Sequence, residues 1–534
     1  MLFVLVMYNN LMKRSVWFWA LAVIAVVGVG ILLIPRNSLR YLNQYYVTDS
    51  AWDALISSRH ENLSLEPGKI IFNGTPLQLD AEGNRLFYLV QPSAISYQLP
   101  SVVIDNKEIN IATRCQSFNL DDIQNNHEYE ILIYNQHEFR KMSLVLTTLP
   151  IMNIDTLGTP DIGDEDSLAA IQLYSPDDTI GSKTYIHLRG STSKILEKQS
   201  FKLNLINDNG KNNKLSLLNM RSDDDWILNS LYGDFEKVRN ILSAQLWKDC
   251  CSEHNLSGAQ NSFEYRFVEL FIDNSYYGLY LLGYKPDKKI TALKKDEYLF
   301  KNRDWANANV LENDPNFERY YTLEESNGVD EKAAQAELLD FLKILADGNP
   351  QSIRDHFDII NAIDIELHAM LTAEMDYIRD GATKNLYVAI KQSGDRRYVM
   401  YTPWDFDLSF GNTWQDGIKN NTSTFSYGVG PKIVPESSAM PVPILRAQGD
   451  SMINDEVERR YAELRKGAWS TENIMSLINN YENDIFSSGA FYRDEARWPM
   501  GNYLENATDL NTFRNFVSQR LLFLDSYYNL AHAE

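Results

Sequence analysis

Two segments near residues 380 and 405 carry the side chains that phosphoryl transfer needs. Asp380 precedes Asn385 by five residues, and Asp405 and Asp407 lie in the segment 404–407, whose sequence is Trp-Asp-Phe-Asp. An aspartate can accept the proton of a substrate hydroxyl, and carboxylate and amide oxygens are ligands that Mg²⁺ prefers when it neutralises the phosphates of a nucleotide. We therefore predict Asp380 as the catalytic base and Asn385, Asp405 and Asp407 as metal ligands.

The five-residue spacing after Asp380 is that of the catalytic loop of protein kinases. Spacing alone is weak support in a chain with 72 acidic residues. An alternative for Asp405 and Asp407 is that they cap the turn that follows them, because short acidic side chains readily accept hydrogen bonds from nearby backbone amides.

Asp376 competes with Asp380 for the role of base, because both would lie on one face if the helix predicted over 359–374 continues. Only Asp380 lies five residues before an asparagine. Asp376 is better placed to end or cap the helix and to pair with Arg379 or Lys384, so the spacing favours Asp380.

A hairpin is predicted between the two segments. Residues 386–390 and 397–401 are strand-like runs, residues 392–395 have the composition of a tight turn, and Pro403 ends the second strand. The order is a loop, a hairpin and a second loop, so the predicted base and metal ligands can face one metal pocket.

A second group of candidate residues follows the predicted strand 183–189. Arg189 ends this strand, and the loop after it, which contains Ser191, can offer backbone amides to phosphates. Lys198 and Lys202 lie four residues apart, in or near the next strand, and one of them could bridge phosphates. The pattern of a P-loop is absent, so an ordinary turn and exposed lysines are the alternatives.

The rest of the chain alternates between strand-rich and helix-rich stretches. Helical apolar spacing predicts helices over 236–249, 332–346, 359–374, 456–466, 470–488 and 510–530, and a hairpin is predicted over 267–282. We divide the 534 residues into an N-terminal segment (1–14), a transmembrane anchor (15–34), a tether (35–62), a β-rich accessory domain resembling a small β-sandwich (63–150) and a catalytic domain (165–530).

The anchor is predicted from the almost unbroken apolar run 15–34. Such a run is long enough to cross about 30 Å of hydrocarbon as a helix. Lys13 and Arg14 precede it, which favours an inside amino terminus and a catalytic domain outside the cytoplasm. A cleaved signal peptide is the alternative, although no small-x-small cleavage site ends the run.

Composition narrows the partners and cofactors. The formal net charge of −22 argues against nucleic acid as a partner. Cys115, Cys250 and Cys251 are too few for a disulfide framework or a spaced zinc site. The acidity makes basic or cationic partners more plausible, and a device for solubility is the alternative.

Several motifs occur in order along the chain, and together they are far more specific than one spacing. They lie at 188–193, 198–202, 225–229, 237–240, 277–282, 403–407 and 410–411. In these motifs, over roughly residues 165–530, the chain resembles the CotH family of spore-coat-type protein kinases, an atypical branch of the protein-kinase-like fold.

The resemblance implies an α+β, atypical protein-kinase-like catalytic domain that uses ATP and Mg²⁺ or Mn²⁺ to phosphorylate Ser or Thr of a protein. It implies that Lys198 or Lys202 steadies the phosphates. It also identifies Arg189 and Arg239 as arginines of the family, which either contact a ligand or have a structural role. The chain departs from the family at Tyr284, where an acidic residue is usual, and this departure implies weakened or altered nucleotide binding.

Two other classes of function stay open. A pseudokinase or cell-surface binding protein would use the same fold to recognise a protein, and Tyr284 is its best support. A carbohydrate-binding or cell-envelope structural protein would use the aromatic residues and the β-rich first domain, but aromatic content alone cannot support it. The intact set of predicted base and metal ligands favours the membrane-anchored kinase.

Overall fold

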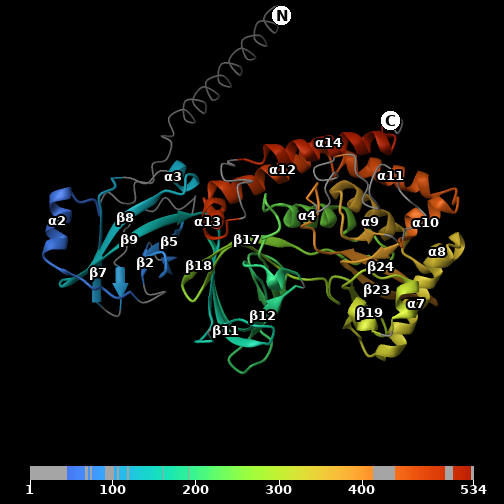
Figure 1. The fold of residues 1–534 in the computed structure, drawn as a ribbon, viewed down its shortest axis with the longest axis horizontal. Helices are drawn as coiled ribbons and strands as arrows, with labels where there is room; N and C mark the ends of the chain where they lie inside the picture. Colours follow the sequence, from blue (N-terminus) through green and yellow to red (C-terminus); the bar gives the residue numbers. More distant parts are fainter. Residues whose placement is uncertain are drawn as a thin grey trace, which may run out of the picture. The chain divides into compact units, whose positions relative to one another are not determined.

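The computed structural model describes most of the chain from residue 45 onward. The described residues are 45–65, 70–72, 75–90, 102–104, 107–116, 120–159, 161–190, 192–314, 316–379, 381–412, 422, 439–499 and 509–530. They belong to two compact units, Met1–Thr147 and Thr148–Glu534, which are described separately (Figure 1).

The first unit is built on one seven-stranded sheet with the order β4-β5-β9-β8-β7-β6, to which β1 adds by pairing with β9. Its elements are α2 (Asp49–Ser57), β1 (His60–Glu61), β2 (Ile71–Phe72), β3 (Thr75–Pro76), β4 (Gln78–Asp80), β5 (Arg85–Leu89), β6 (Val102–Ile104), β7 (Lys107–Thr113), α3 (Leu120–Gln124), β8 (Glu128–Tyr134) and β9 (Glu138–Thr147). The only other sheet described here is the two-stranded β2–β3 pair. The strands therefore form one large sheet and one hairpin, and not the two comparable sheets that a β-sandwich requires.

The second unit begins with a closed barrel of order β10-β11-β12-β13-β16-β18-β17, in which β10 closes the ring by pairing in parallel with β17. The elements of this half are β10 (Ile151–Asp155), β11 (Ser167–Tyr174), β12 (Thr179–Arg189), η2 (Thr192–Ile195), β13 (Ser200–Ile206), β14 (Leu215–Ser216), β15 (Ser222–Asp223), β16 (Asp225–Asn229), α4 (Arg239–Cys251), β17 (Tyr265–Ile272) and β18 (Ser275–Gly283). Closure leaves no free edge among these strands.

A four-stranded sheet of order β20-β19-β23-β24 and a set of helices follow the barrel. Their bounds are β19 (Tyr298–Asn302), α5 (Ala308–Asn313), α6 (Phe317–Tyr320), β20 (Tyr321–Glu325), α7 (Glu331–Asp347), α8 (Pro350–His356), α9 (Ile359–Thr372), β21 (Ile378–Arg379), β22 (Ala382–Thr383), β23 (Leu386–Ser393), β24 (Arg396–Pro403), α10 (Pro441–Ala447), α11 (Ile453–Lys466), α12 (Thr471–Glu482), η4 (Asn483–Ser487), α13 (Ala490–Arg497) and α14 (Asn511–Tyr527). α9 packs on β24 and is covered by α4, α10, α11 and α14, while α13 packs on β18 of the barrel (Figure 1).

Local sequence explains where the central helices begin and end. The side chains of Asp330 and Asp358 accept hydrogen bonds from backbone amides in the first turns of α7 and α9. Gly348 ends α7 in the left-handed conformation, which glycine adopts without steric cost. The α9 helix is buried along nearly its whole length, so its apolar residues form the core between the sheet and the outer helices.

The structure corrects the prediction of a transmembrane helix and of a membrane-anchored, extracytoplasmic protein. Among the residues that the structure describes, no helix is long and apolar enough to cross a membrane. A span needs about 20 apolar residues, whereas α7 and α14, the longest described helices, have 17 residues each and carry several charged side chains. The predicted span, residues 15–34, lies outside the described residues. Membrane anchoring is therefore no part of the function proposed for this chain.

Candidate active site

The β23–β24 hairpin brings Asn385 and Asp405 close together. The first residue of β23 pairs with the last residue of β24, so the residues that flank the hairpin lie at one end of it. The backbone N–H of Trp404 donates to the carbonyl oxygen of Asn385 (3.0 Å), and the N–H of Asn385 donates to the carbonyl oxygen of Asn302 at the end of β19 (3.1 Å). The predicted metal ligands are thus fixed to the sheet by backbone hydrogen bonds.

Both of these residues have a left-handed backbone conformation. The φ angle is +56° at Asn385 and +70° at Asp405. A residue other than glycine in this region costs on the order of 1 kcal/mol or more and persists only where the surrounding structure imposes it. The fold therefore holds these two side chains in directions that an ordinary strand end or turn would not give them.

The Asp376 carboxylate contacts the side chain of Asn385. Nδ2 of Asn385 donates to Oδ2 of Asp376 (2.8 Å), and Nζ of Lys384 donates to the same oxygen (2.9 Å). Burial raises the pKa of Asp376, the Lys384 ammonium opposes that shift, and the Asp405 carboxylate adds to it. The predicted pairing with Lys384 is confirmed, but α9 ends at Thr372, so Asp376 follows the helix and does not end it.

Two predicted site residues, Asp380 and Ser191, lie outside the described residues. Their roles as catalytic base and phosphate-binding residue stay predictions.

Asn385 and Asp405 have oxygens that suit a metal ion. Nδ2 of Asn385 is used by Asp376, while its Oδ1 and the Asp405 carboxylate accept no hydrogen bond from any described residue. An amide oxygen and a carboxylate are hard ligands of the kind that Mg²⁺ and Mn²⁺ take, with water and phosphate oxygens completing the shell. The part of the chain that the structure describes contains no group of three or more His, Cys, Asp or Glu placed to hold a metal ion.

Two further carboxyl groups, those of Glu374 and Asp407, surround this pair. Oε1 of Glu374 accepts hydrogen bonds from the backbone N–H groups of Met375 (3.1 Å) and Asp376 (3.0 Å), and its buried Oε2 accepts none from described residues. Burial raises the pKa of Glu374 and of Asp407 well above the usual range, and the carboxylates of Asp376 and Asp405 add to both shifts. Such mutual repulsion favours a bound cation.

Phe406 anchors the segment that carries Asp405 and Asp407. Its ring packs against those of His368 on α9 (centroids 5.4 Å apart) and Phe263 (5.9 Å), and its backbone N–H donates to Oδ1 of Asn240 on α4 (3.1 Å). His368 in turn bonds the carbonyl oxygen of Ser243 on α4 through Nε2 (2.9 Å). Burial lowers the pKa of His368 to about 4, so the ring is neutral and the contacts around Phe406 are those of a packed core.

Comparison with protein families identifies the fold. The family described as CotH kinase protein matches residues 186–524. The chain belongs to the CotH kinase family. The match runs from β12 into α14 and covers more than half of the chain, which confirms the resemblance seen in the motifs. No curated protein matches the chain.

Lys198 of the CotH kinase domain is fully buried. Its Nζ donates to Oδ1 of Asp494 on α13 (2.5 Å) and to the carbonyl oxygen of Leu279 on β18 (2.7 Å), and it lies 4.8 Å from the centre of the Tyr280 ring. The ammonium group therefore already has its partners within the protein, between the barrel and α13.

Lys202 and Arg189 are more accessible to a ligand. Lys202 on β13 is partly exposed and lies 3.5 Å from Asp225, a distance typical of a loose ion pair. The Arg189 guanidinium at the end of β12 lies over the ring of Trp404, 5.6 Å from its centre. Arg189 is thus next to the segment with the predicted metal ligands, whereas Arg239 is buried and pairs with Asp234 (2.7 Å).

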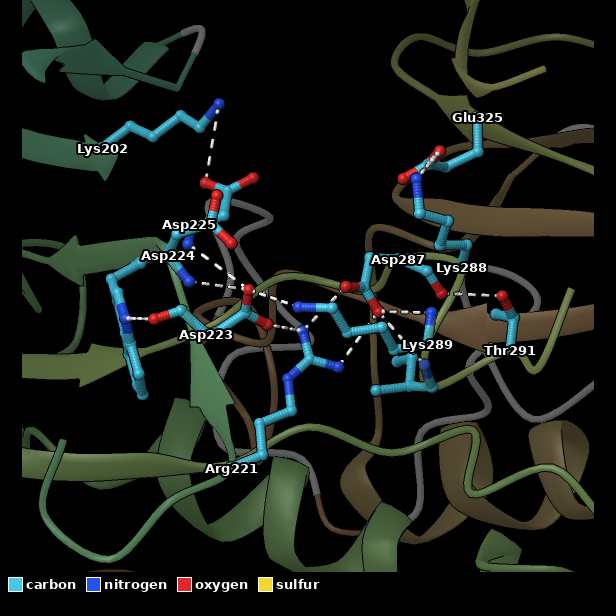
Figure 2. Close-up of polar contacts among 12 residues, drawn as sticks. Lys202, Arg221, Asp223, Asp224, Asp225, Asp287, Lys288, Lys289, Thr291 and Glu325 are labelled. Atoms are coloured by element: carbon cyan, nitrogen blue, oxygen red, sulfur yellow. Dashed lines mark hydrogen bonds and ion pairs between the residues drawn. The ribbon is translucent and has the colours of Figure 1, made fainter. Parts of the chain in front are cut away.

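Tyr284, where the resemblance predicts an acidic residue, has its side chain buried in the connector 284–297 between the barrel and the four-stranded sheet. Its ring meets that of Trp226 edge-on (centroids 6.1 Å), and the Arg221 guanidinium lies 4.0 Å from the ring centre. Figure 2 shows Arg221 between Asp223 and Asp287, with bidentate hydrogen bonds to Asp287 of 2.9 and 3.0 Å. The Tyr284 side chain therefore packs the connector against the barrel.

Sequence reasoning considered Asp376 as an alternative base and missed Glu374. The five-residue spacing drew attention to Asp380, although Asp376 also precedes Asn385, by nine residues. The available signal was the pair Glu374 and Asp376 directly after α9, since buried acidic side chains are rare unless they have a function.

Proposed function

We propose that this CotH kinase domain transfers the γ-phosphate of ATP to Ser or Thr of a protein, with Mg²⁺ or Mn²⁺ held by Asn385 and Asp405. The contact between Asp376 and Asn385, with Asp405 on the neighbouring strand end, carries the proposal. It combines a candidate base and two candidate metal ligands in one site, which a pure binding module does not need.

In this proposal Asp376 acts as the base, because its carboxylate contacts the side chain of Asn385. Its pKa is raised by burial and by Asp405, and a carboxylate whose pKa lies closer to neutral accepts a proton more readily. In the proposed step the hydroxyl proton moves to Asp376, the hydroxyl oxygen bonds to the γ-phosphorus, and the bond from that phosphorus to the bridging oxygen of ADP breaks. The bound metal would neutralise charge on the phosphates.

Glu374 and Lys384 position this base. Glu374 accepts from the backbone N–H of Asp376, and Lys384 holds one of its carboxylate oxygens, so the second oxygen can turn toward a substrate. Lys202 and Arg189 are the cations best placed for the phosphates, because Lys198 is satisfied by Asp494. The loose pair of Lys202 with Asp225 costs little to open.

The test is incorporation of phosphate from labelled ATP with Mg²⁺ or Mn²⁺, using self-labelling and a generic Ser/Thr protein as acceptors. Asp376→Asn and Asp405→Asn are each expected to lower the rate about 100-fold or more, the loss usual for a removed general base or metal ligand. Asp208→Asn is the matched control, because Asp208 is 90% exposed and is not one of the candidate site residues.

Each alternative predicts a different pattern. If Asp380→Asn abolishes incorporation while Asp376→Asn remains active, the base is Asp380, as its spacing predicts. If the wild-type chain neither transfers phosphate nor binds nucleotide, the kinase proposal is refuted and the chain is better described as a pseudokinase or binding protein. Nucleotide binding without transfer would point to a missing acceptor.

A further inference from the structure

The backbone of Phe406, between Asp405 and Asp407, is bound to the side chain of Asn240. The N–H of Phe406 donates to Oδ1 of Asn240 (3.1 Å), and its carbonyl oxygen accepts from Oγ of Ser409 (2.7 Å). Asn240 is the second residue of α4 and is 1% exposed, while Phe406 has no exposed surface. Because both residues are buried, the Phe406 N–H depends on Asn240 for its acceptor.

This hydrogen bond acts on the backbone conformation of Asp405. The N–H that Asn240 accepts belongs to the peptide group that joins Asp405 to Phe406. On the other side, the N–H of Trp404 donates to the carbonyl oxygen of Asn385 (3.0 Å). Asp405 has a φ of +70°, a conformation that a residue other than glycine keeps only where its surroundings impose it. The bonds at Trp404 and Phe406 supply that constraint from both sides.

The same segment is tied to α4 and to the chain before this helix at two further points. Nε of Arg239 donates to the carbonyl oxygen of Ser409 (2.9 Å), and Nδ2 of Asn412 donates to the carbonyl oxygen of Gly233 (2.9 Å). The helix itself packs on α9 and on β17 of the barrel (Figure 1). Of these contacts, that of Asn240 acts directly beside the predicted metal ligand.

We propose that Asn240 is a positioning residue for metal binding, because its side chain keeps the Asp405 carboxylate in the direction in which it meets the metal ion of a metal–nucleotide complex. This inference rests on the proposed function, since it assumes that Asp405 holds that ion. Without the acceptor, the peptide group between Asp405 and Phe406 can rotate, and Asp405 can relax to an ordinary backbone conformation that turns its carboxylate away. Replacing a side chain that orients a metal ligand typically changes metal affinity or activity about 10- to 100-fold.

The experiment measures the affinity of the full chain for MnATP, and for ATP in excess chelator, by titration calorimetry. Asn240→Leu keeps the approximate size of the side chain and removes the acceptor. It should weaken MnATP about tenfold or more and leave the affinity for metal-free ATP unchanged. In the assay of phosphate incorporation, a higher Mn²⁺ concentration should restore part of the rate that this variant loses.

Asn361→Leu is the matched control. Asn361 on α9 has no exposed surface, and its Oδ1 accepts from the backbone N–H of Tyr401 on β24 (2.7 Å). The control therefore makes the same chemical change at the backbone of the strand that leads to Asp405, but four residues before it. Asn361→Leu should leave the affinity for MnATP unchanged.

Thermal unfolding separates positioning from stability. Both leucine variants should lower the melting temperature of the ligand-free chain, because each leaves a buried N–H without an acceptor. Only Asn240→Leu should also reduce the increase in melting temperature that MnATP produces. If Asn240→Leu does not fold, Asn240→Ala and Asn361→Ala give the same comparison, since alanine also removes the acceptor and is favoured in helices.

The outcomes separate the two proposals. If wild type binds MnATP and the Asn240 variants bind it equally well, the role of Asn240 is overturned and the kinase proposal stands. The same holds if the Asn361 variants weaken MnATP by the same factor, or if the Asn240 variants weaken metal-free ATP as much as MnATP. If wild type binds no nucleotide, both proposals fall. Weaker binding that is confined to MnATP and to the Asn240 variants supports the positioning role.

Discussion

Replacing Asp494 by Asn should destabilise the CotH kinase domain by about 3 to 5 kcal/mol, the usual cost of removing one partner from a buried ion pair. Oδ1 of Asp494 accepts hydrogen bonds from Nζ of Lys198 (2.5 Å) and from the backbone N–H of Leu279 (2.8 Å), and Nζ of Lys237 lies 3.3 Å from Oδ2. The side chains of Asp494 and both lysines have no exposed surface. An asparagine keeps the shape and can still accept from Leu279, but it removes the charge.

Most of the lost stability should come from the effect on Lys198. Lys237 keeps a second carboxylate, that of Glu495 at 3.1 Å, whereas the other partner of Lys198 is a neutral carbonyl oxygen. Burial already lowers the pKa of Lys198 to about 8, and Asp494 is the main group that opposes this shift. Without Asp494, Lys198 would either stay charged without a counter-ion or lose its proton on folding, and both are unfavourable.

The assay is urea unfolding of the full chain, followed by tryptophan fluorescence. Asp208→Asn is the control, because it makes the same chemical change in an exposed ion pair with Lys183 and should cost less than about 1 kcal/mol. The double variant Lys198→Met with Asp494→Leu should recover a large part of the loss, since both charges are then absent. Equal destabilisation by Asp494→Asn and Asp208→Asn would refute the reasoning.

Two other predictions concern stability. The pKa of His368 falls to about 4 on burial, so the unfolded chain binds the proton first as pH decreases; stability should be complete above pH 6.5 and decrease toward pH 4 by at most about 1.4 kcal/mol per unit. His368→Gln should flatten that part of the curve in urea unfolding at several pH values, and an unchanged slope would contradict a buried neutral ring. Gly278 has a φ of +128°, and a Cβ there would lie 2.5 Å from Oδ1 of Asp494 and 3.1 Å from Nε1 of Trp498. Gly278→Ala should therefore lower the melting temperature in a thermal scan, whereas Gly394→Ala, in an open turn at φ +60°, should lower it less.

Much of the fold of the second unit could be predicted because local patterns determine it. The hairpins predicted at 267–282 and around 392–395 correspond to β17–β18 and β23–β24, and the predicted helices at 332–346 and 359–374 correspond to α7 and α9. Barrel closure was not predictable, because the parallel pairing of β10 with β17 joins strands more than a hundred residues apart and leaves no local signal.

The candidate site was likewise predictable only in part. The hairpin fixes Asn385 and Asp405 at one end, so their proximity followed from the strand and turn pattern. The environments of the lysines could not be predicted from local patterns. Lys198 pairs with Asp494, which lies 296 residues away in the sequence, and nothing local distinguishes Lys198 from Lys202. The choice between Asp376 and Asp380 stays a prediction, because Asp380 lies outside the described residues. The contact of Asp376 with Asn385 depends on the path of the chain after α9, which spacing does not describe.

The site keeps several features that cost stability when no ligand is bound. Asn385 and Asp405 have left-handed backbones, and four carboxyl groups repel one another. The packing of Phe406 against His368 and Phe263 and the hydrogen bond from Phe406 to Asn240 hold the segment in place despite these costs. A divalent cation would relieve the repulsion among the carboxylates. The same features that weaken the ligand-free fold are therefore those that a metal–nucleotide complex would satisfy, as expected when a site is organised before its ligand arrives.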